Sequence, residues 1–136
     1  MKRDLAETLR AKRIQPSAQR LAVAGYVLDT LEHPSADQVF ARVKAACPAI
    51  SRATVYNTLN LFVAKGLLRS LVLAEGKVLF DPHVEPHHHF IDEATGRIHD
   101  VPWDALEVSR VGALPGLDVR EYQVVLRGRR RGRRTV

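Results

Sequence analysis

Sulfur is nearly absent from this chain. Its 136 residues include one cysteine, Cys47, and one methionine. A single cysteine excludes an intrachain disulfide and a zinc site built from several cysteines. We interpret Cys47 as a packing residue near a helix end. A reactive thiol is the alternative, although the chain offers no second cysteine to resolve it.

Long apolar runs are also missing. No stretch approaches the roughly 20 apolar residues needed to cross a bilayer, and the N-terminus has no apolar segment typical of a signal peptide. We therefore expect a cytoplasmic protein without a membrane partner. The apolar content of 46% is sufficient for a packed core, and 136 residues are enough for one ordinary domain or two small ones.

Acidic residues are fewer than basic ones. The 15 Asp and Glu against 21 Lys and Arg give a formal net charge of +6. This excess favours a polyanionic partner; the alternative is a basic protein whose charge only aids solubility. Part of the excess lies in arginines between Arg127 and Arg134, and we expect residues 128–136 to form a solvated basic tail.

The first 80 residues predict four helices followed by a hairpin. Apolar periodicity and N-cap residues predict helices over 4–13, 17–32, 35–46 and 52–65, and strands over 67–73 and 77–80. The apolar stripe of the second helix includes Leu21, Leu28 and Leu31. Ser35 and Gln38 form a capping box. Three helices before a hairpin is the order of a winged helix, preceded here by one more helix.

The third and fourth helices fit a helix-turn-helix, whose second helix enters the major groove of DNA. Arg52 can reach a phosphate or guanine, and Asn57 can pair with the edge of adenine. Tyr56 lies on an otherwise polar face, where its ring can pack on thymine methyl groups; the alternative is packing against the wing. The candidate DNA-binding residues are Arg20, Ser51, Arg52, Thr54, Tyr56 and Asn57.

The pattern changes after Pro82. We expect strands over 87–92, 96–101 and 119–126 and a helix over 103–111, with Leu106 and Val111 as core candidates. A unit of this size is hard to stabilise alone, so we expect it to dimerise through its sheet. The predicted fold class is α+β. Its parts are a winged-helix DNA-binding domain over 1–81, a hinge over 82–86 and a small α+β dimerisation domain over 87–127.

Five of the six histidines lie between Phe80 and Asp100. In a strand, His87 and His89 point to one face and His88 to the other. Such a pair can chelate a metal, and Asp81 and Asp100 flank it. Imidazole with carboxylate suits Fe(II), Mn(II) or Zn(II). The alternative is a solvated histidine-rich loop.

Several segments together resemble those of a known family. They are the stretch SRATVYNTLNLF at 51–62, HPSAD at 33–37, FD at 80–81 and PHHHFI at 86–91. In order and spacing they resemble the ferric uptake regulator family over nearly the whole chain. The resemblance implies a homodimeric, metal-dependent transcriptional repressor that binds an inverted-repeat operator in double-stranded DNA, and not an enzyme.

Within that family the chain is most similar to the peroxide-responsive repressor branch, whose residue types it shares at Asn57 and Asp100. The resemblance implies one regulatory site for Fe(II) or Mn(II). It also implies that Fe(II) catalyses oxidation of His33 or His87 to 2-oxo-histidine, after which DNA is released. The matching metal ligands are His33, Asp81, His87, His89 and Asp100.

The chain also departs from the family pattern. Most relatives hold a structural zinc with two Cys-x-x-Cys pairs, but the first pair falls here on Asp92 and Thr95, so we expect no structural zinc. We assign His88 and His99 to the surface or to hydrogen bonds behind the ligands, and His83 is an alternative ligand. Two other functions remain open: a regulator responding to iron, manganese or haem without peroxide chemistry, and a non-haem iron enzyme.

Overall fold

The computed structural model of this chain describes residues 4–74 and 76–132. The chain divides into two compact units, Met1–Val84 and Glu85–Val136. The division falls within the predicted hinge, residues 82–86. None of the described helices has the length and apolar character to cross a membrane. The part of the predicted basic tail that contains Arg133 and Arg134 lies outside the described residues.

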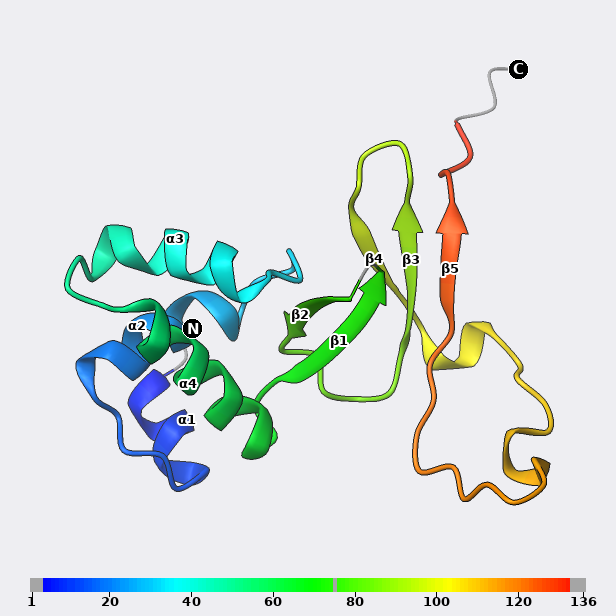
Figure 1. The fold of residues 1–136 in the computed structure, drawn as a ribbon, viewed down its shortest axis with the longest axis horizontal. Coiled ribbons are helices and arrows are strands. Elements are labelled where there is room, and N and C mark those ends of the chain that lie inside the picture. The colour runs from blue at the N-terminus through cyan, green and yellow to red at the C-terminus, as the bar shows by residue number, and fades with distance from the viewer. Residues whose placement is uncertain (1–3, 75, 133–136) are drawn as a thin grey trace. The chain divides into compact units, whose positions relative to one another are not determined.

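Residues 4–74 form four α-helices in the first unit (Figure 1). They are α1 (Leu5–Ala11), α2 (Ala18–Val27), α3 (Ala36–Ala46) and α4 (Arg52–Ala64). Each follows an N-cap whose side chain accepts a hydrogen bond from the backbone N–H three residues later. The predicted capping box of α3 is confirmed, because Ser35 and Gln38 each accept a hydrogen bond from the other's backbone N–H.

The helices enclose one apolar core. Val23 and Val27 of α2, Val39 of α3, and Leu59 and Phe62 of α4 are all fully buried. The spacing of four residues in α2 and of three in α4 places each pair on one face of its helix. The opposite face of α4 is therefore left at the surface.

The second helix ends five residues before the predicted end at Glu32. Beyond Val27 the Thr30 hydroxyl accepts a hydrogen bond from the Glu32 backbone N–H at 3.2 Å. This local bond offers the backbone an alternative to the helix. The prediction that Leu31 belongs to the buried stripe is wrong, because its side chain is 86% exposed.

A hairpin completes the first unit. Strands β1 (Arg69–Ala74) and β2 (Lys77–Asp81) pair antiparallel. Leu79 bridges to Ser35, and the Phe80 N–H donates to the Pro34 carbonyl at 2.9 Å. These contacts join the end of the hairpin to the segment that precedes α3.

The second unit contains a three-stranded sheet in the order β4-β3-β5. The strands are β3 (His88–Asp92), β4 (Ile98–Val101) and β5 (Val125–Gly128). Strand β3 pairs antiparallel with β4 and parallel with β5 (Figure 1). His89 lies opposite Asp100 on β4, and residues directly opposite in an antiparallel pair share a face of the sheet.

Two predictions for this unit are wrong. Residues 103–111 do not form one helix but two short 3-10 turns, Trp103–Ala105 and Val111–Ala113. Trp103 stacks on the His88 ring at 4.6 Å between centroids and packs on Tyr122 at 4.8 Å. The strand expected over 119–126 begins only at Val125. The Val124 N–H donates a hydrogen bond to the His88 ring nitrogen and not to the backbone of a neighbouring strand.

Candidate functional site

His33 and Asp81 form a pair within the first unit. The His33 Nε2 atom lies 3.2 Å from Asp81 Oδ2, and both side chains are buried. His33 has a φ angle of 50°, a left-handed conformation that is uncommon outside glycine and often marks a functional constraint. The hairpin contacts at Pro34 and Phe80 place the two residues beside each other.

His87, His89 and Asp100 form a second group, within the second unit. The Nε2 atoms of His87 and His89 lie 3.5 and 3.8 Å from the same Asp100 oxygen, Oδ1. The imidazole rings are 4.5 Å apart between centroids. His87 immediately precedes β3 and its ring contacts that of His89, and the pairing of His89 with Asp100 brings the carboxylate to the same face.

The protonation of His87 is constrained by its neighbour in the chain. His87 Nδ1 lies 2.7 Å from the Glu85 carbonyl oxygen. A carbonyl only accepts hydrogen bonds, so Nδ1 is the donor, and in the neutral ring the lone pair is then on Nε2. This is the tautomer in which Nε2 can bind a metal.

The remaining histidines have other surroundings. His83 is exposed, and its backbone N–H donates to Asp81 Oδ1 at 2.9 Å. His88 is buried, so of its two expected places the surface is wrong and a hydrogen-bonded position remains. Its Nδ1 accepts the Val124 N–H at 2.9 Å. His99 is half-buried and lies beside Phe90.

The positions of the family's first cysteine pair form a turn in this chain. Asp92 Oδ1 accepts the Ala94 backbone N–H at 2.9 Å, and the Thr95 hydroxyl accepts the Arg97 backbone N–H at 3.2 Å. The hydrogen bond from Ala94 holds the pKa of the Asp92 carboxyl below its ordinary value. Both side chains therefore stabilise the turn between β3 and β4.

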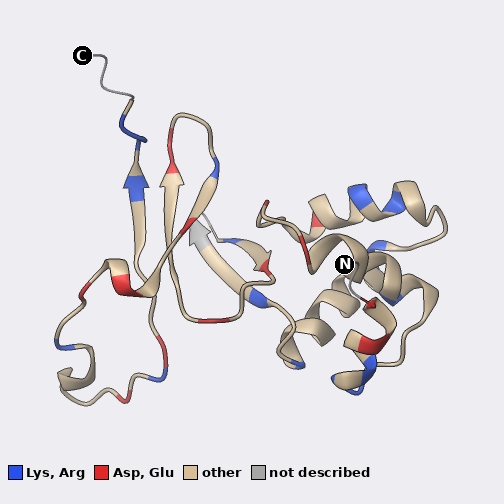
Figure 2. Cartoon of the chain, turned by 180° about the vertical axis from the view of Figure 1, so that it is seen from behind, with Lys and Arg blue, Asp and Glu red and all other residues tan. Residues whose placement is uncertain are grey.

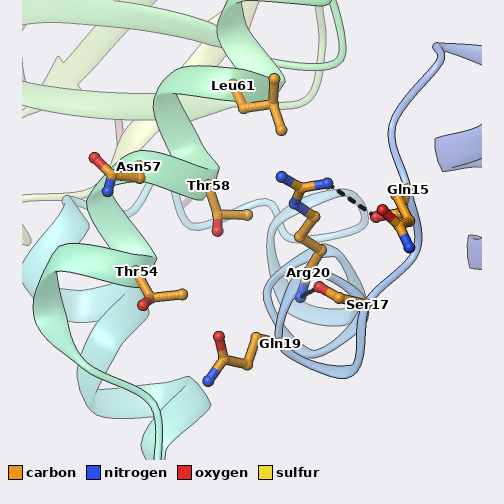
Figure 3. A pocket seen from close by; sticks show the side chains of 8 residues that line it. All are labelled: Gln15, Ser17, Gln19, Arg20, Thr54, Asn57, Thr58 and Leu61. Carbon is orange, nitrogen blue, oxygen red and sulfur yellow. Dashed lines mark hydrogen bonds between the residues drawn. The ribbon is translucent and has the colours of Figure 1, made fainter.

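The predicted DNA-binding residues fall into two groups around α4. The first group consists of Arg20, Thr54 and Asn57. These residues line a pocket of about 380 Å³ between α4 and the beginning of α2 (Figure 3). The guanidinium of Arg20 enters it and donates to the Gln15 carbonyl at 3.1 Å. The lining residues are Gln15, Ser17, Gln19, Arg20, Thr54, Asn57, Thr58 and Leu61.

The second group is held by an acidic residue of α3. Arg52 and Tyr56 both contact Asp37, and Tyr56 is 41% exposed. The sixth residue, Ser51, caps α4: its hydroxyl oxygen accepts the Thr54 N–H at 3.1 Å. Figure 2 shows Lys and Arg over the helices and gathered where β5 ends.

Sequence reasoning missed the roles of Asp37 and Gln15. The sequence places Asp37 in the first turn of α3, where a carboxylate interacts favourably with the helix dipole. It does not show that α4 crosses close to that turn. Gln15 contributes its backbone carbonyl, and a backbone contact has no residue signature.

Known proteins resemble this chain over most of its length. The sequence model of the ferric uptake regulator family matches residues 12–124. The peroxide operon regulator of Bacillus subtilis (strain 168) is 30% identical over 128 residues, covering 93% of this chain and 88% of that protein.

Two solved structures share the fold. The ferric uptake regulator of Vibrio cholerae has a TM-score of 0.73 and 22% identity, covering 93% of this chain and 99% of the other. The peroxide stress regulator of Campylobacter jejuni has a TM-score of 0.66 and 25% identity, covering 95% of each chain. The α+β fold of this chain is thus shared with these regulators, and the family and its curated members are transcriptional regulators, not enzymes. The chain belongs to the ferric uptake regulator family, the metal-responsive transcriptional regulators.

Proposed function

We propose that this protein is a DNA-binding repressor that responds to peroxide through one regulatory metal site. The observation that carries the proposal is the convergence of His87 and His89 on one Asp100 oxygen, with Nδ1 of His87 bonded to the Glu85 carbonyl. His33 and Asp81 supply a second ligand pair. The ligand set is His33, Asp81, His87, His89 and Asp100.

The donor chemistry of these residues fits a divalent metal. Three imidazoles and two carboxylates offer nitrogen and oxygen atoms, which suit Fe(II), Mn(II) and Zn(II). His87 also contacts a backbone carbonyl through Nδ1, and metal-binding histidines commonly make such a contact through the ring nitrogen that does not bind the metal. We propose Fe(II) or Mn(II) as the regulatory ion.

The division of the proposed ligands between the two units suggests how the metal regulates DNA binding. His33 and Asp81 belong to the unit that carries α4, and the other three belong to the unit that carries the sheet. If all five bind one ion, the orientation of the DNA-binding unit depends on that ion. The coupling requires that the DNA-binding arrangement hold the ion more tightly than the alternatives do.

Peroxide acts on the ligands themselves in this proposal. Fe(II), if bound there, would catalyse the reduction of peroxide by the adjacent imidazole, whose ring carbon loses two electrons and a hydrogen to it, whereas Mn(II) does not undergo this reaction readily. His33 or His87 gains one oxygen and becomes 2-oxo-histidine, and water is the other product. The added carbonyl weakens the ring as a donor, the units separate and DNA is released.

The second unit forms the homodimer in this proposal. Strand β5 lies at an edge of its sheet, with Leu126 37% exposed. An edge strand can pair with another chain, and a small unit gains stability by doing so. A dimer places two copies of α4 against the two halves of an inverted repeat, about one DNA turn apart.

We also propose that no structural zinc is present. Asp92 and Thr95 hold the β3–β4 turn with their own hydrogen bonds, and the chain has a single cysteine. Folding should then survive chelators, unlike the folding of a domain that depends on structural zinc.

The decisive experiment is peptide mapping after brief exposure to peroxide. Protein loaded with Fe(II) should gain one oxygen on His33 or His87 and lose DNA binding. Protein loaded with Mn(II) should bind DNA and keep both histidines unmodified. Loss of DNA binding with unmodified histidines would instead establish a regulator that responds to iron, manganese or haem without peroxide chemistry, a function that the same ligand types also suit.

A further inference from the structure

One carboxylate oxygen joins the two helices of the helix-turn-helix. Asp37 Oδ1 accepts a hydrogen bond from Arg52 Nη1 at 2.6 Å and another from the Tyr56 hydroxyl at 2.9 Å. Asp37 is in the first turn of α3. Arg52 and Tyr56 are four residues apart and therefore lie one above the other on the same face of α4.

The Arg52 guanidinium has a second partner on α3. Its central carbon lies 4.6 Å from the centre of the Phe40 ring, within the range of a cation–π contact. Phe40 follows Asp37 by three residues, so the carboxylate and the ring lie on the same side of α3. Together they hold the guanidinium over the α3 surface.

This cluster contributes little to folding. The side chains of Arg52 and Asp37 are 60% and 67% exposed, and exposed ion pairs contribute little to stability. The same carboxylate lies next to two residues expected to approach DNA, which is a polyanion. The Asp37 carboxylate neutralises the charge of Arg52 there and so opposes DNA binding. This cost is offset only where contacts of Arg52 with DNA are strong enough to replace its contact with Asp37.

We propose that Asp37 is a positioning residue that sets the sequence discrimination of the DNA-binding face. It fixes the direction of the Tyr56 ring. It also keeps Arg52 in an ion pair that contacts with DNA phosphates alone do not replace. The bases of a matching operator replace Asp37 as the contact partners of Arg52 and Tyr56, whereas the bases of other DNA do not. The inference rests on the proposed binding of DNA by α4 and adds the residue that regulates it.

A spectroscopic property reports the cluster without DNA. The hydrogen bond to Asp37 raises the pKa of the Tyr56 phenol above its ordinary value of 10.0. Replacing Asp37 with asparagine should lower that pKa, because the negative charge is lost while the amide oxygen can still accept a hydrogen bond. Ultraviolet titration of the phenol, with Tyr56→Phe subtracted, measures the shift.

The test compares three variants with the wild-type protein loaded with Mn(II). Asp37→Asn removes the charge, Asp37→Ala also removes the acceptor, and Asp118→Asn makes the same change in net charge at an exposed loop residue of the second unit. The probes are a short duplex of scrambled sequence and a duplex that the wild-type protein itself enriches from a random pool. Circular dichroism verifies that each variant is folded.

Both Asp37 variants should bind the scrambled duplex more tightly, by up to about fivefold per protomer, the upper range for an exposed ion pair. Their salt dependence should steepen by about 0.9 per released arginine, the value for one more phosphate contact. Affinity for the enriched duplex should rise less, so discrimination falls. In an Arg52→Gln background, Asp37→Asn should no longer strengthen binding to the scrambled duplex.

Several results would overturn the proposal. If Asp37→Asn and Asp118→Asn change both affinities equally, only net charge matters. If Asp37→Asn still acts in the Arg52→Gln background, the effect does not pass through Arg52. An unchanged Tyr56 titration in Asp37→Asn would refute the hydrogen bond in solution. Failure of the wild-type protein to enrich any duplex would refute the proposed DNA binding instead, so the two failures are distinguishable.

Discussion

Mn(II) added to the metal-free protein should raise the melting temperature of both units together. At free Mn(II) about 100 times its Kd, binding stabilises the folded state by about 2.7 kcal/mol. The 136 residues have an unfolding entropy of about 0.29 kcal/mol/K, at roughly 2.1 cal/mol/K per residue. If the two units unfold as one when metal is bound, the ratio of these quantities is a rise of about 9 °C.

The structure provides a separate reporter for each unit. The described α-helices, α1–α4, all lie in Met1–Val84, so far-ultraviolet circular dichroism follows that unit. Trp103 is the only tryptophan of the chain and lies in Glu85–Val136. Its fluorescence therefore follows the second unit in the same sample.

Ligand deletions then test whether the units share the ion. His33→Ala should abolish the shift seen by circular dichroism, while the three ligands of the second unit preserve a smaller shift in Trp103 fluorescence. His87→Ala should abolish both shifts. His83→Ala tests the alternative ligand, and the assigned ligand set predicts that this variant retains the full rise.

Two results would refute the reasoning. A rise confined to Trp103 fluorescence in the wild-type protein would show that the first unit contributes no ligand. An equal loss of the rise in His83→Ala and His33→Ala would show that the ligand set is wrongly assigned.

Four further predictions concern the fold and the metal content. Phe62→Ala should lower the free energy of unfolding by about 3–5 kcal/mol in urea titrations, because the ring is fully buried. Gly66→Ala should lower it by about 1–2 kcal/mol, because Gly66 has a φ angle of 79° after α4. The carboxylate of Asp92 has a lowered pKa, so its stabilisation is complete above its ordinary value of 3.8 and is lost as pH falls through the folded value. The melting temperatures of wild type and Asp92→Asn should differ at neutral pH and converge in acid. Elemental analysis should find one divalent metal per protomer and no chelator-resistant zinc; a second, tightly held zinc in every subunit would contradict the proposal for Asp92 and Thr95.

Helix beginnings could be predicted from the sequence because their causes are local. Ser35 and Gln38 are three residues apart, and the reciprocal hydrogen bonds between them need no other part of the chain. The same holds for the Asp4 and Ser51 caps. The periodicity of Val55, Leu59 and Phe62 likewise predicts the buried face of α4 from spacing alone.

The errors concern segments whose conformation depends on distant residues. Residues 103–111 resemble a short helix, but Trp103 packs on His88 and Tyr122. The strand expected from Val119 starts late because the Val124 N–H is bonded to His88. Both differences involve His88, whose burial could not be known before the sheet was formed.

The sequence by itself determined the types of the proposed metal ligands and the shared face of His87 and His89, since side chains alternate along an extended chain. Only the tertiary structure decided their partners. Asp100 faces His89 because of the β3–β4 register, and Asp81 meets His33 because the hairpin bonds to the segment before α3. Asp37 contacts Arg52 and Tyr56 because α3 and α4 cross at that point. Each partnership joins residues far apart in the chain, and packing of the whole domain selects such contacts.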